Sequence, residues 1–424
     1  MARICLVTTG QPSTNPRLVK EADALVSAGH AVHVIGAHRA DWADGSDRAL
    51  LADRAWTNQI IDFRRANTAL FWKLRIRHRV ARFAGRMPAF GGPWLGAAVS
   101  PVTPELTMAA LGHRADLYIA HNLGALPAAA AAASRHGARL GFDAEDFHSG
   151  QFTPAESTER QIARIVEERF LPRCDYVTAA SPGVADEYSA LGLGDTPTVI
   201  LNVFPRAERP SHGPEEGHVG GRWRLYWFSQ TIGRDRGLEE AIAAVAQLAD
   251  LPVEIHVRGE WQPDYETRLR TQARRVGLAD ARIVAHAPAP AAQMVRLAAA
   301  YDVGLALEPG RSDNNDLALS NKVFTYVLAG VPVLASATTA HRAIGETLGD
   351  AIAVVDIGDV AGVADALRFW FSHPARLQAA RRAAWALGAD RFNWDVEKQK
   401  FLGVVDRVLS QPRVRAPRAA ELAS

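Results

Sequence analysis

The stretch NDLALSNKVFTYVLAGVPVLAS, residues 315–336, predicts a polar loop, a helix and a strand in direct succession. The apolar run over 322–329 favours a helix, and Gly330 favours its end. The following residues, 331–336, have the composition of a buried strand. A helix that leads straight into a buried strand is typical of α/β sheets, so this stretch indicates that fold class.

The same stretch places three polar residues at the start of its helix, namely Ser320, Asn321 and Lys322. A helix start carries free backbone N–H groups and a partial positive charge, and both attract anions. The stretch therefore predicts an anion site. The alternative is that Ser320 only caps the helix and that Lys322 is solvated.

Strands and helices alternate in the same way along most of the chain. Strands are expected before residue 205 over 3–9, 31–37, 115–122, 138–145, 174–181 and 196–202. After residue 222, and besides 331–336, they are expected over 223–230, 252–259, 281–287 and 302–309. Apolar strands separated by helices indicate parallel sheets that are covered on both faces.

A polar segment, 205–222, interrupts this alternation and predicts a linker. It separates an expected Rossmann-like domain over 1–204 from a second one over 223–395. A C-terminal helix is expected over 396–411 and a disordered tail over 412–424. The predicted fold class is α/β, with two doubly wound domains that face each other across a cleft where ligands bind.

The composition argues against several classes of protein. The 424 residues carry a formal net charge of only +2, so no nucleic-acid partner is expected. Neither a membrane-spanning helix nor a signal peptide is expected from the apolar runs. Neither half has a G-x-G-x-x-G or a P-loop motif after its first strand. Two cysteines, Cys5 and Cys174, favour a reducing, cytoplasmic location.

Two segments resemble the retaining glycosyltransferases of the GT-B fold, close to family four. They are NKVFTYVLAGVPVLAS at 321–336 and AAYDVGLALEPG at 299–310. The resemblance covers about residues 1–405. It implies transfer of a sugar from a nucleotide diphosphate-sugar to an acceptor hydroxyl, with retention of configuration and with neither a metal nor a cofactor. It also implies that the C-terminal domain holds the donor.

The resemblance assigns donor contacts to the C-terminal domain. Those expected at the diphosphate are Arg234, Arg236, Ser320, Asn321 and Lys322. Those expected at the nucleoside are Gly259, His286, Ala287, Glu308 and Thr325. The family usually has a pair of glutamates, and the corresponding positions here hold Leu317 and Thr325. Both carboxylates are therefore missing, and Glu308 is the candidate to supply one in their place. For the two arginines, the alternative is a solvated loop.

In the N-terminal domain, the resemblance assigns Asn15 and Arg17 to the acceptor side. His121 ends an expected strand, and Glu145 and Asp146 belong to a cluster of titratable groups over 143–148. These three are the expected catalytic residues, which would orient or deprotonate the acceptor. The alternatives are a solvated Arg17, a structural His121 and acidic groups that only cap their loop.

A basic segment, 70–86, predicts a helix with two contrasting faces. One carries arginines and the other apolar side chains: Arg75, Arg79, Arg82 and Arg86 against Ile76, Val80 and Phe83. Such a helix suits an anionic membrane interface, and with it a lipid-linked acceptor at the inner face of the membrane. The alternative is a helix packed on its own domain with a solvated arginine face.

Two other functions fit the same fold. A GT-B sugar-nucleotide epimerase requires an acid and a base, which the segment 143–148 offers. A non-catalytic protein that binds a nucleotide fits the absence of carboxylates at Leu317 and Thr325.

Overall fold

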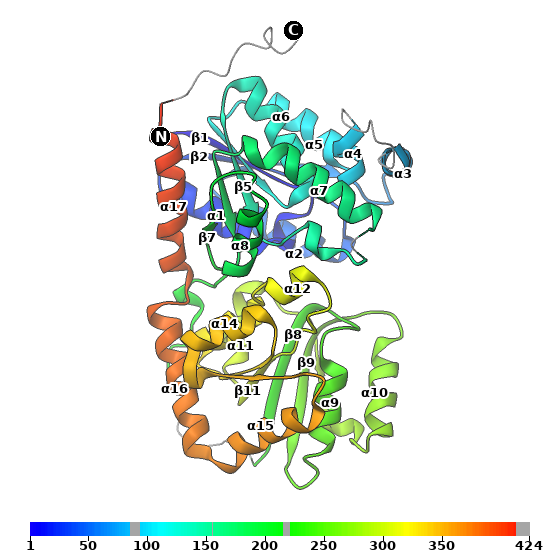
Figure 1. Ribbon diagram of the computed structural model, residues 1–424, viewed down its shortest axis with the longest axis vertical. Coiled ribbons are helices and arrows are strands. Elements are labelled where there is room, and N and C mark those ends of the chain that lie inside the picture. Colours follow the sequence, from blue (N-terminus) through cyan, green and yellow to red (C-terminus); the bar gives the residue numbers. More distant parts are fainter. Residues whose placement is uncertain (85–93, 155, 215–220, 413–424) are drawn as a thin grey trace. The chain divides into compact units, whose positions relative to one another are not determined.

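The computed structural model describes residues 1–84, 94–154, 156–214 and 221–412, and its chain forms two compact units (Figure 1). The first unit comprises Met1–Ile200 and the chain from Lys398 onward, and the second comprises Leu201–Glu397. The return to the first unit falls within α17, Trp394–Ser410. Part of the expected linker, 215–220, lies outside the described residues, as does the expected tail from residue 413 onward.

The first unit is built on a parallel sheet. Within the described residues its strand order is β3-β2-β1-β4-β5-β6-β7. The strands are β1 (Arg3–Thr8), β2 (Ala31–His38), β3 (Thr57–Asp62), β4 (Leu117–His121), β5 (Arg139–Ala144), β6 (Tyr176–Ala179) and β7 (Thr198–Val199). The helices are α1 (Pro16–Ser27), α2 (Asp44–Ala52), α3 (Thr68–Ala84), α4 (Trp94–Val99), α5 (Thr103–Gly112), α6 (Leu126–His136), α7 (Thr158–Phe170) and α8 (Pro182–Ala190). The strand order reverses between β1 and β4, which is where ligands bind in such sheets.

The second unit has a parallel sheet of the same kind, with the order β10-β9-β8-β11-β12-β13 in its described part. The strands are β8 (Trp223–Ile232), β9 (Val253–Trp261), β10 (Ile283–His286), β11 (Val303–Ala306), β12 (Val333–Ser336) and β13 (Ile352–Val355). The helices are α9 (Leu238–Ala246), α10 (Tyr265–Arg275), α11 (Met294–Ala298), α12 (Asp313–Leu317), α13 (Asn321–Ala329), α14 (Thr339–Leu348), α15 (Val360–Ser372) and α16 (Pro374–Asp390). Its order reverses between β8 and β11.

Two parallel sheets with crossover helices confirm the predicted fold class, two doubly wound Rossmann-like domains. Two strands, β3 and β13, were not predicted. Both lie at a sheet edge and none of their residues is buried, so they lack the apolar run by which the central strands were recognised. The predicted strand at 196–202 is confined to the two residues of β7.

The stretch at 315–336 folds as its sequence predicts. Ser320 is the N-cap of α13, Gly330 is its C-cap in the left-handed conformation (φ 73°), and β12 follows with every residue buried. All residues of α13 after Asn321 are buried, so this helix belongs to the core of the second unit. The start of the helix is thereby fixed to the carboxyl edge of the sheet.

A glycine brings the loop after β8 against the end of β11. Gly237 has a φ of 77°, and a Cβ there would lie 2.0 Å from the carbonyl oxygen of Leu307. Because no other residue fits both the conformation and the space, Gly237 allows the loop that carries Arg236 to contact the segment that carries Glu308.

We expect Gly237→Ala to lower the free energy of unfolding by about 2–5 kcal/mol, from the left-handed backbone and the clash together. Gly277→Ala is the matched control, because Gly277 has a similar φ of 83° but nothing within 4 Å of an added Cβ. The control should lose only about 1–2 kcal/mol. Urea denaturation of both variants measures the difference, and equal losses would show that the contact with Leu307 is unimportant.

Candidate functional site

The start of α13 is tied to the segment that follows β11. The Oγ of Ser320 accepts the N–H of Lys322 at 3.4 Å and donates to Oε1 of Glu308 at 3.0 Å. The Nζ of Lys322 forms an ion pair with the same carboxylate. Helix α13 therefore presents its free N–H groups and a lysine ammonium beside one half-buried carboxylate.

Lys322 is buried and is therefore not the solvated lysine of the alternative reading. Its side chain is 9% exposed, and its Nζ lies 5.4 Å from the centre of the Trp227 ring. Burial alone would raise the pKa of Glu308, but the neighbouring charge of Lys322 holds that pKa below its usual range. The carboxylate of Glu308 is thus ionised, and an anion at the start of α13 would share Lys322 with it.

Two buried acceptor atoms at this edge have no hydrogen-bond partner within the described residues. They are Oε2 of Glu308 and Nε2 of His341. The Nδ1 of His341 lies 2.9 Å from the carbonyl oxygen of Ser336, and burial lowers the pKa of the ring. A neutral ring that donates from Nδ1 keeps its Nε2 lone pair free. Buried acceptors without donors suit hydroxyl groups of a ligand or bound water.

The two arginines after β8 have different surroundings. Arg236 is half-buried and its Nη1 lies 3.4 Å from Oγ of Ser229, so it stays with the sheet edge. Arg234 is exposed and lines an open depression of about 580 Å³. Other residues that line this depression are Asp235, Tyr265, Arg268, Arg275 and Arg311. Arg234 therefore lies with residues of α10 around this depression. Arg236 instead directly precedes Gly237, the residue that contacts Leu307 at the end of β11.

Three predicted nucleoside contacts are already engaged within the second unit. Gly259 has a φ of 149°, and a Cβ there would lie 2.3 Å from the carbonyl oxygen of Ser229, so the neighbouring strand alone explains this glycine. The Nε2 of His286 lies 2.9 Å from Nδ1 of His256. The carbonyl oxygen of Ala287 accepts a hydrogen bond of 2.7 Å from Arg258. One lone pair of that carbonyl is left for a ligand.

The prediction for Thr325 is wrong. Its side chain is fully buried, and its Oγ1 donates to the carbonyl oxygen of Asn321 at 3.0 Å within α13. A hydroxyl that bonds back to its own helix in the core does not reach a ribose. Thr325 therefore does not replace the missing carboxylate, which leaves Glu308 as the carboxylate at this edge.

The prediction for Arg17 is also wrong, and so is its solvated alternative. The guanidinium is fully buried and makes two hydrogen bonds of 2.7 Å to the carboxylate of Asp143. Its Nη1 donates to the carbonyl oxygen of Ile200. Asn15 caps α1, because its Oδ1 accepts the N–H of Leu18 at 3.0 Å. Arg17 therefore offers none of its guanidinium nitrogens to an acceptor, and Asn15 uses its side-chain oxygen within its own helix start.

His121 lies in the same buried cluster, between two carboxylates. Its Nε2 is 3.2 Å from Glu21 and its Nδ1 is 3.3 Å from Asp143. Burial alone would lower the pKa of His121, but Glu21 and Asp143 raise it to about 9. The ring is therefore protonated and enclosed, so His121 is not placed to take a proton from an acceptor. Its charge is balanced by Asp143, while burial, and next the charge of Asp143, raise the pKa of Glu21.

Glu145 has the surroundings expected of a general base. It follows β5 at the carboxyl edge of the sheet and is partly exposed, unlike His121. Burial, and next the charge of Asp146, raise the pKa of Glu145 to about 7. A carboxylate with a pKa near neutrality accepts protons efficiently at physiological pH. Asp146 accepts a hydrogen bond of 2.8 Å from Gln151.

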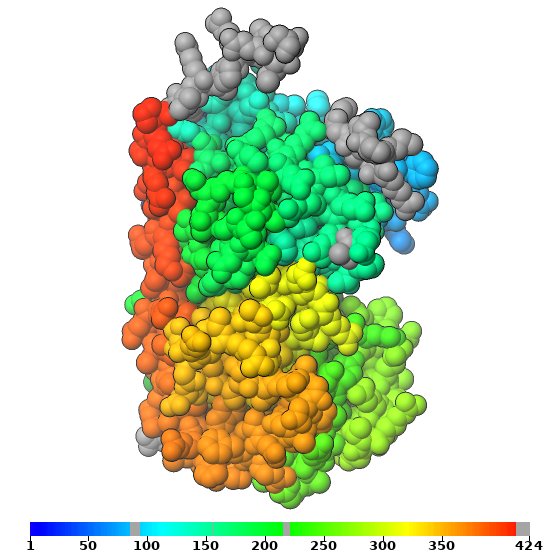
Figure 2. Space-filling model, in the orientation of Figure 1, coloured from blue at the N-terminus to red at the C-terminus, as the bar shows by residue number. Residues whose placement is uncertain are grey.

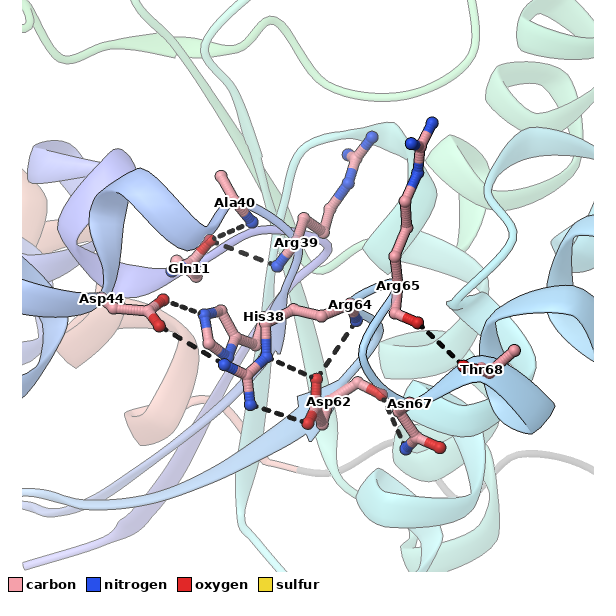
Figure 3. A network of polar contacts seen from close by, with 10 residues as sticks. All are labelled: Gln11, His38, Arg39, Ala40, Asp44, Asp62, Arg64, Arg65, Asn67 and Thr68. Atoms are coloured by element: carbon pink, nitrogen blue, oxygen red, sulfur yellow. Dashed lines mark hydrogen bonds and ion pairs between the residues drawn. The ribbon is translucent and has the colours of Figure 1, made fainter.

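A polar network lies after β1, β2 and β3 (Figure 3). Arg64 binds both oxygens of Asp62 at 2.9 Å and also reaches Asp44, which pairs with His38. Figure 3 shows the side chains of Arg39 and Arg65 pointing away from this network. Both are exposed. This edge thus presents two guanidinium groups to solvent.

Two groups of side chains in the described part of the chain are close enough together to share a metal ion, namely Glu21, His121 and Asp143, and His38, Asp41 and Asp44. Arg17 occupies the first group with its two bonds to Asp143, and Arg64 contacts the second through Asp44. Cations of the protein thus already neutralise these carboxylates. The expected independence from metal remains a prediction.

The residues of these sites that were missed by the sequence analysis include Glu21, Asp62 and His341. The spacing of Arg17 and Glu21, four residues apart on one helix, is the signal that would have paired them. Asp62 ends a strand that was not predicted. His341 lies inside α14, where no local pattern distinguishes a buried ring from a solvated one.

Both halves of the chain match models of glycosyltransferase domains. Residues 14–203 match the glycosyl transferase 4-like domain, and residues 234–403 match a glycosyl transferase-like domain. Together the two matches span most of the chain. None of the curated proteins compared with the chain has a significantly similar sequence.

Several solved structures are similar to this chain over almost its whole length. The Anabaena protein HepE in complex with UDP and glucose has a TM-score of 0.71 and 18% identity, covering 96% of this chain and 100% of its own. Sucrose-phosphate synthase from Thermosynechococcus elongatus has a TM-score of 0.69 and 15% identity, covering 96% and 99%. A putative UDP-N-acetylglucosamine 2-epimerase from Listeria monocytogenes has a TM-score of 0.60 and 13% identity, covering 97% and 98%. At these identities the likeness shows the fold, which is GT-B.

Replacing Arg17 by Met should lower the free energy of unfolding by about 3–5 kcal/mol, because Asp143 and Glu21 then lose their buried counter-charge. Arg164→Ala is the control, since Arg164 pairs with Glu168 on the surface of α7 and should lose at most about 0.5 kcal/mol. Guanidinium denaturation of both variants gives the comparison. Similar small losses would contradict the view that this cluster depends on Arg17.

Proposed function

The chain belongs to the glycosyltransferases, and we propose that it transfers a sugar from a UDP-sugar to an acceptor hydroxyl, with retention and without a metal ion. The resemblance to retaining enzymes supports the stereochemistry, and the protein cations around both acidic groupings support metal-independent chemistry. The choice of uracil is supported by similar structures of HepE, which is bound in them to UDP and to UDP-glucose.

The observation that carries this proposal is the start of α13, where Ser320, Lys322 and Glu308 meet. Negative charge builds on the diphosphate as the bond to the sugar breaks. A helix N-terminus and a buried ammonium stabilise that charge in surroundings from which water is largely excluded. Glu308 holds Lys322 in position before the donor arrives, so little reorganisation is needed in the transition state.

Glu308 also supports the sugar side of the donor site. Its Oε1 is occupied by Ser320 and Lys322, while its buried Oε2 has no donor in the described chain. A hydroxyl of the donor would satisfy this oxygen with a charge-assisted hydrogen bond. Glu308 is thereby proposed to do part of the work of the two carboxylates absent at Leu317 and Thr325.

The proposed transfer proceeds through an oxocarbenium-like centre. Attack by the acceptor on the face from which the diphosphate leaves retains the configuration, and no protein nucleophile forms a bond to the sugar. Glu145 is proposed to accept the proton of the attacking hydroxyl, and Asp146 helps by raising the pKa of Glu145. The acceptor is proposed to be linked to a lipid, and the enzyme to act in the cytoplasm, at the inner face of the membrane.

One observation favours a second candidate, a sugar-nucleotide epimerase, namely the similarity to a putative UDP-N-acetylglucosamine 2-epimerase. Incubation with UDP-glucose and with UDP-N-acetylglucosamine separates the functions. Slow release of UDP supports transfer to water, whereas a new UDP-sugar supports epimerisation. Binding without either product would indicate a protein that only holds the nucleotide.

We expect Lys322→Met to weaken UDP binding roughly 10- to 100-fold, because an ammonium contact with the diphosphate is lost. Uridine is the matched ligand, since it has no phosphate, and its affinity should not change. Isothermal titration of both ligands with both proteins gives the four dissociation constants. A loss that is equal for uridine and UDP, or absent for UDP, would remove Lys322 from the diphosphate site.

The pH profile of UDP-glucose hydrolysis should rise through about pH 7, because the carboxyl group of Glu145 must be ionised to accept a proton. Glu145→Gln should lower kcat by about 10²- to 10⁴-fold and remove this rise. Asp146→Asn should shift the rise to lower pH, because a charge that raises the pKa of Glu145 is gone. An unchanged profile in Glu145→Gln would exclude it as the base.

A further inference from the structure

Helix α3 exposes a row of large apolar side chains. Trp72, Ile76, Val80 and Phe83 are 55%, 61%, 52% and 65% exposed. With 3.6 residues per turn, their spacing places them on one stripe along the helix. Figure 1 shows α3 at the periphery of the first unit. A contiguous apolar stripe of this size on a surface marks an interaction site.

The orientation of α3 is fixed by contacts on its opposite side. Phe71, Leu74 and Ala81 are buried and form the packed seam of the helix. The Nδ1 of His78 lies 2.7 Å from the carbonyl oxygen of Ala97. Arg77 pairs with Glu105. The apolar row therefore faces solvent because the helix is held by its other face, and not because the helix is loosely placed.

Positive charge flanks the apolar row. Lys73, Arg75 and Arg79 are exposed, and within the described residues none of the three forms an ion pair. Successive residues are 100° apart around a helix, which puts Arg75 and Arg79 on one flank of the row and Lys73 on the other. Of the four arginines expected on one cationic face, Arg82 pairs with Glu159, and Arg86 lies outside the described residues.

We propose that this face of α3 docks on an anionic lipid bilayer, with the apolar row in the acyl boundary and the flanking cations among the head groups. An apolar row between two cationic flanks is the pattern of a helix that lies in a membrane interface, and Trp is enriched at that depth. Trp94, which is 49% exposed at the start of the neighbouring α4, adds an interfacial side chain. This inference rests on the proposed function in one respect, namely that docking would bring the enzyme to a lipid-linked acceptor.

A second copy of the chain is the main competing occupant. Two copies that meet through the same face would bring Arg75 and Arg79 of each copy towards the same groups of the other. Such like-charge contacts oppose association, whereas acidic head groups neutralise the same charges. Within the described residues, none of the helices has the length and apolar composition needed to cross a bilayer, so the contact proposed here lies at the surface.

Flotation with vesicles tests the proposal. The wild-type chain should float with vesicles of phosphatidylcholine mixed with phosphatidylglycerol, and at least tenfold less with phosphatidylcholine alone or in high salt. Two variants, Ile76→Glu with Val80→Glu and Arg75→Gln with Arg79→Gln, should each reduce binding to the mixed vesicles at least tenfold. Phe369→Glu is the control, because Phe369 is 51% exposed on α15 of the second unit and should bind as the wild type does.

The proposal is overturned if the wild type does not float with mixed vesicles, or if the variant with two glutamates floats as the wild type does. It is equally overturned if sedimentation shows a wild-type dimer that this variant dissociates. Melting temperatures establish that each variant is folded, and Trp72→Ser replaces any variant that is not. UDP affinity, measured on the same samples, separates this inference from the proposed function, because flotation without UDP binding would contradict only the latter.

Discussion

The ion pair between Lys322 and Glu308 joins the start of α13 to the end of β11, and the account of the donor site depends on it. A buried lysine without a counter-ion would lose its proton, and a buried carboxylate without one would gain it. The charge of Lys322 holds the pKa of Glu308 below its usual range, and the two side chains are only 9% and 18% exposed. A diphosphate that enters this site would meet an ammonium already desolvated and held in place, which is the condition for strong stabilisation of developing charge.

The first unit also has buried charged side chains that pair with one another near the ends of its strands. Arg17, Glu21, His121 and Asp143 form a buried cluster in which each charge has a partner. Removing one partner from such a cluster is strongly destabilising, because the other charge is then left buried and unpaired. Glu145 stands beside this cluster and is left partly exposed with a pKa near 7. This is the carboxylate that we propose to accept the proton of the acceptor hydroxyl.

A structural feature could be predicted from the sequence where the residues that determine it lie within one short segment. The helix that starts at Ser320 and ends at Gly330 was predicted, because capping residues and an apolar run lie within one segment. The role of Arg17 was not, because its partner Asp143 is distant in sequence and is brought close by β5. Thr325 was misjudged since alignment with a family gives a position but not its burial. The edge strands β3 and β13 were not predicted, because none of their residues is buried and they lack the apolar run of a central strand.

A crystal structure of the chain with UDP would locate the diphosphate. We expect the β-phosphate within hydrogen-bond distance of Lys322 Nζ and of the first N–H groups of α13. A diphosphate bound instead in the depression lined by Arg234, Arg268 and Arg275 would contradict this expectation.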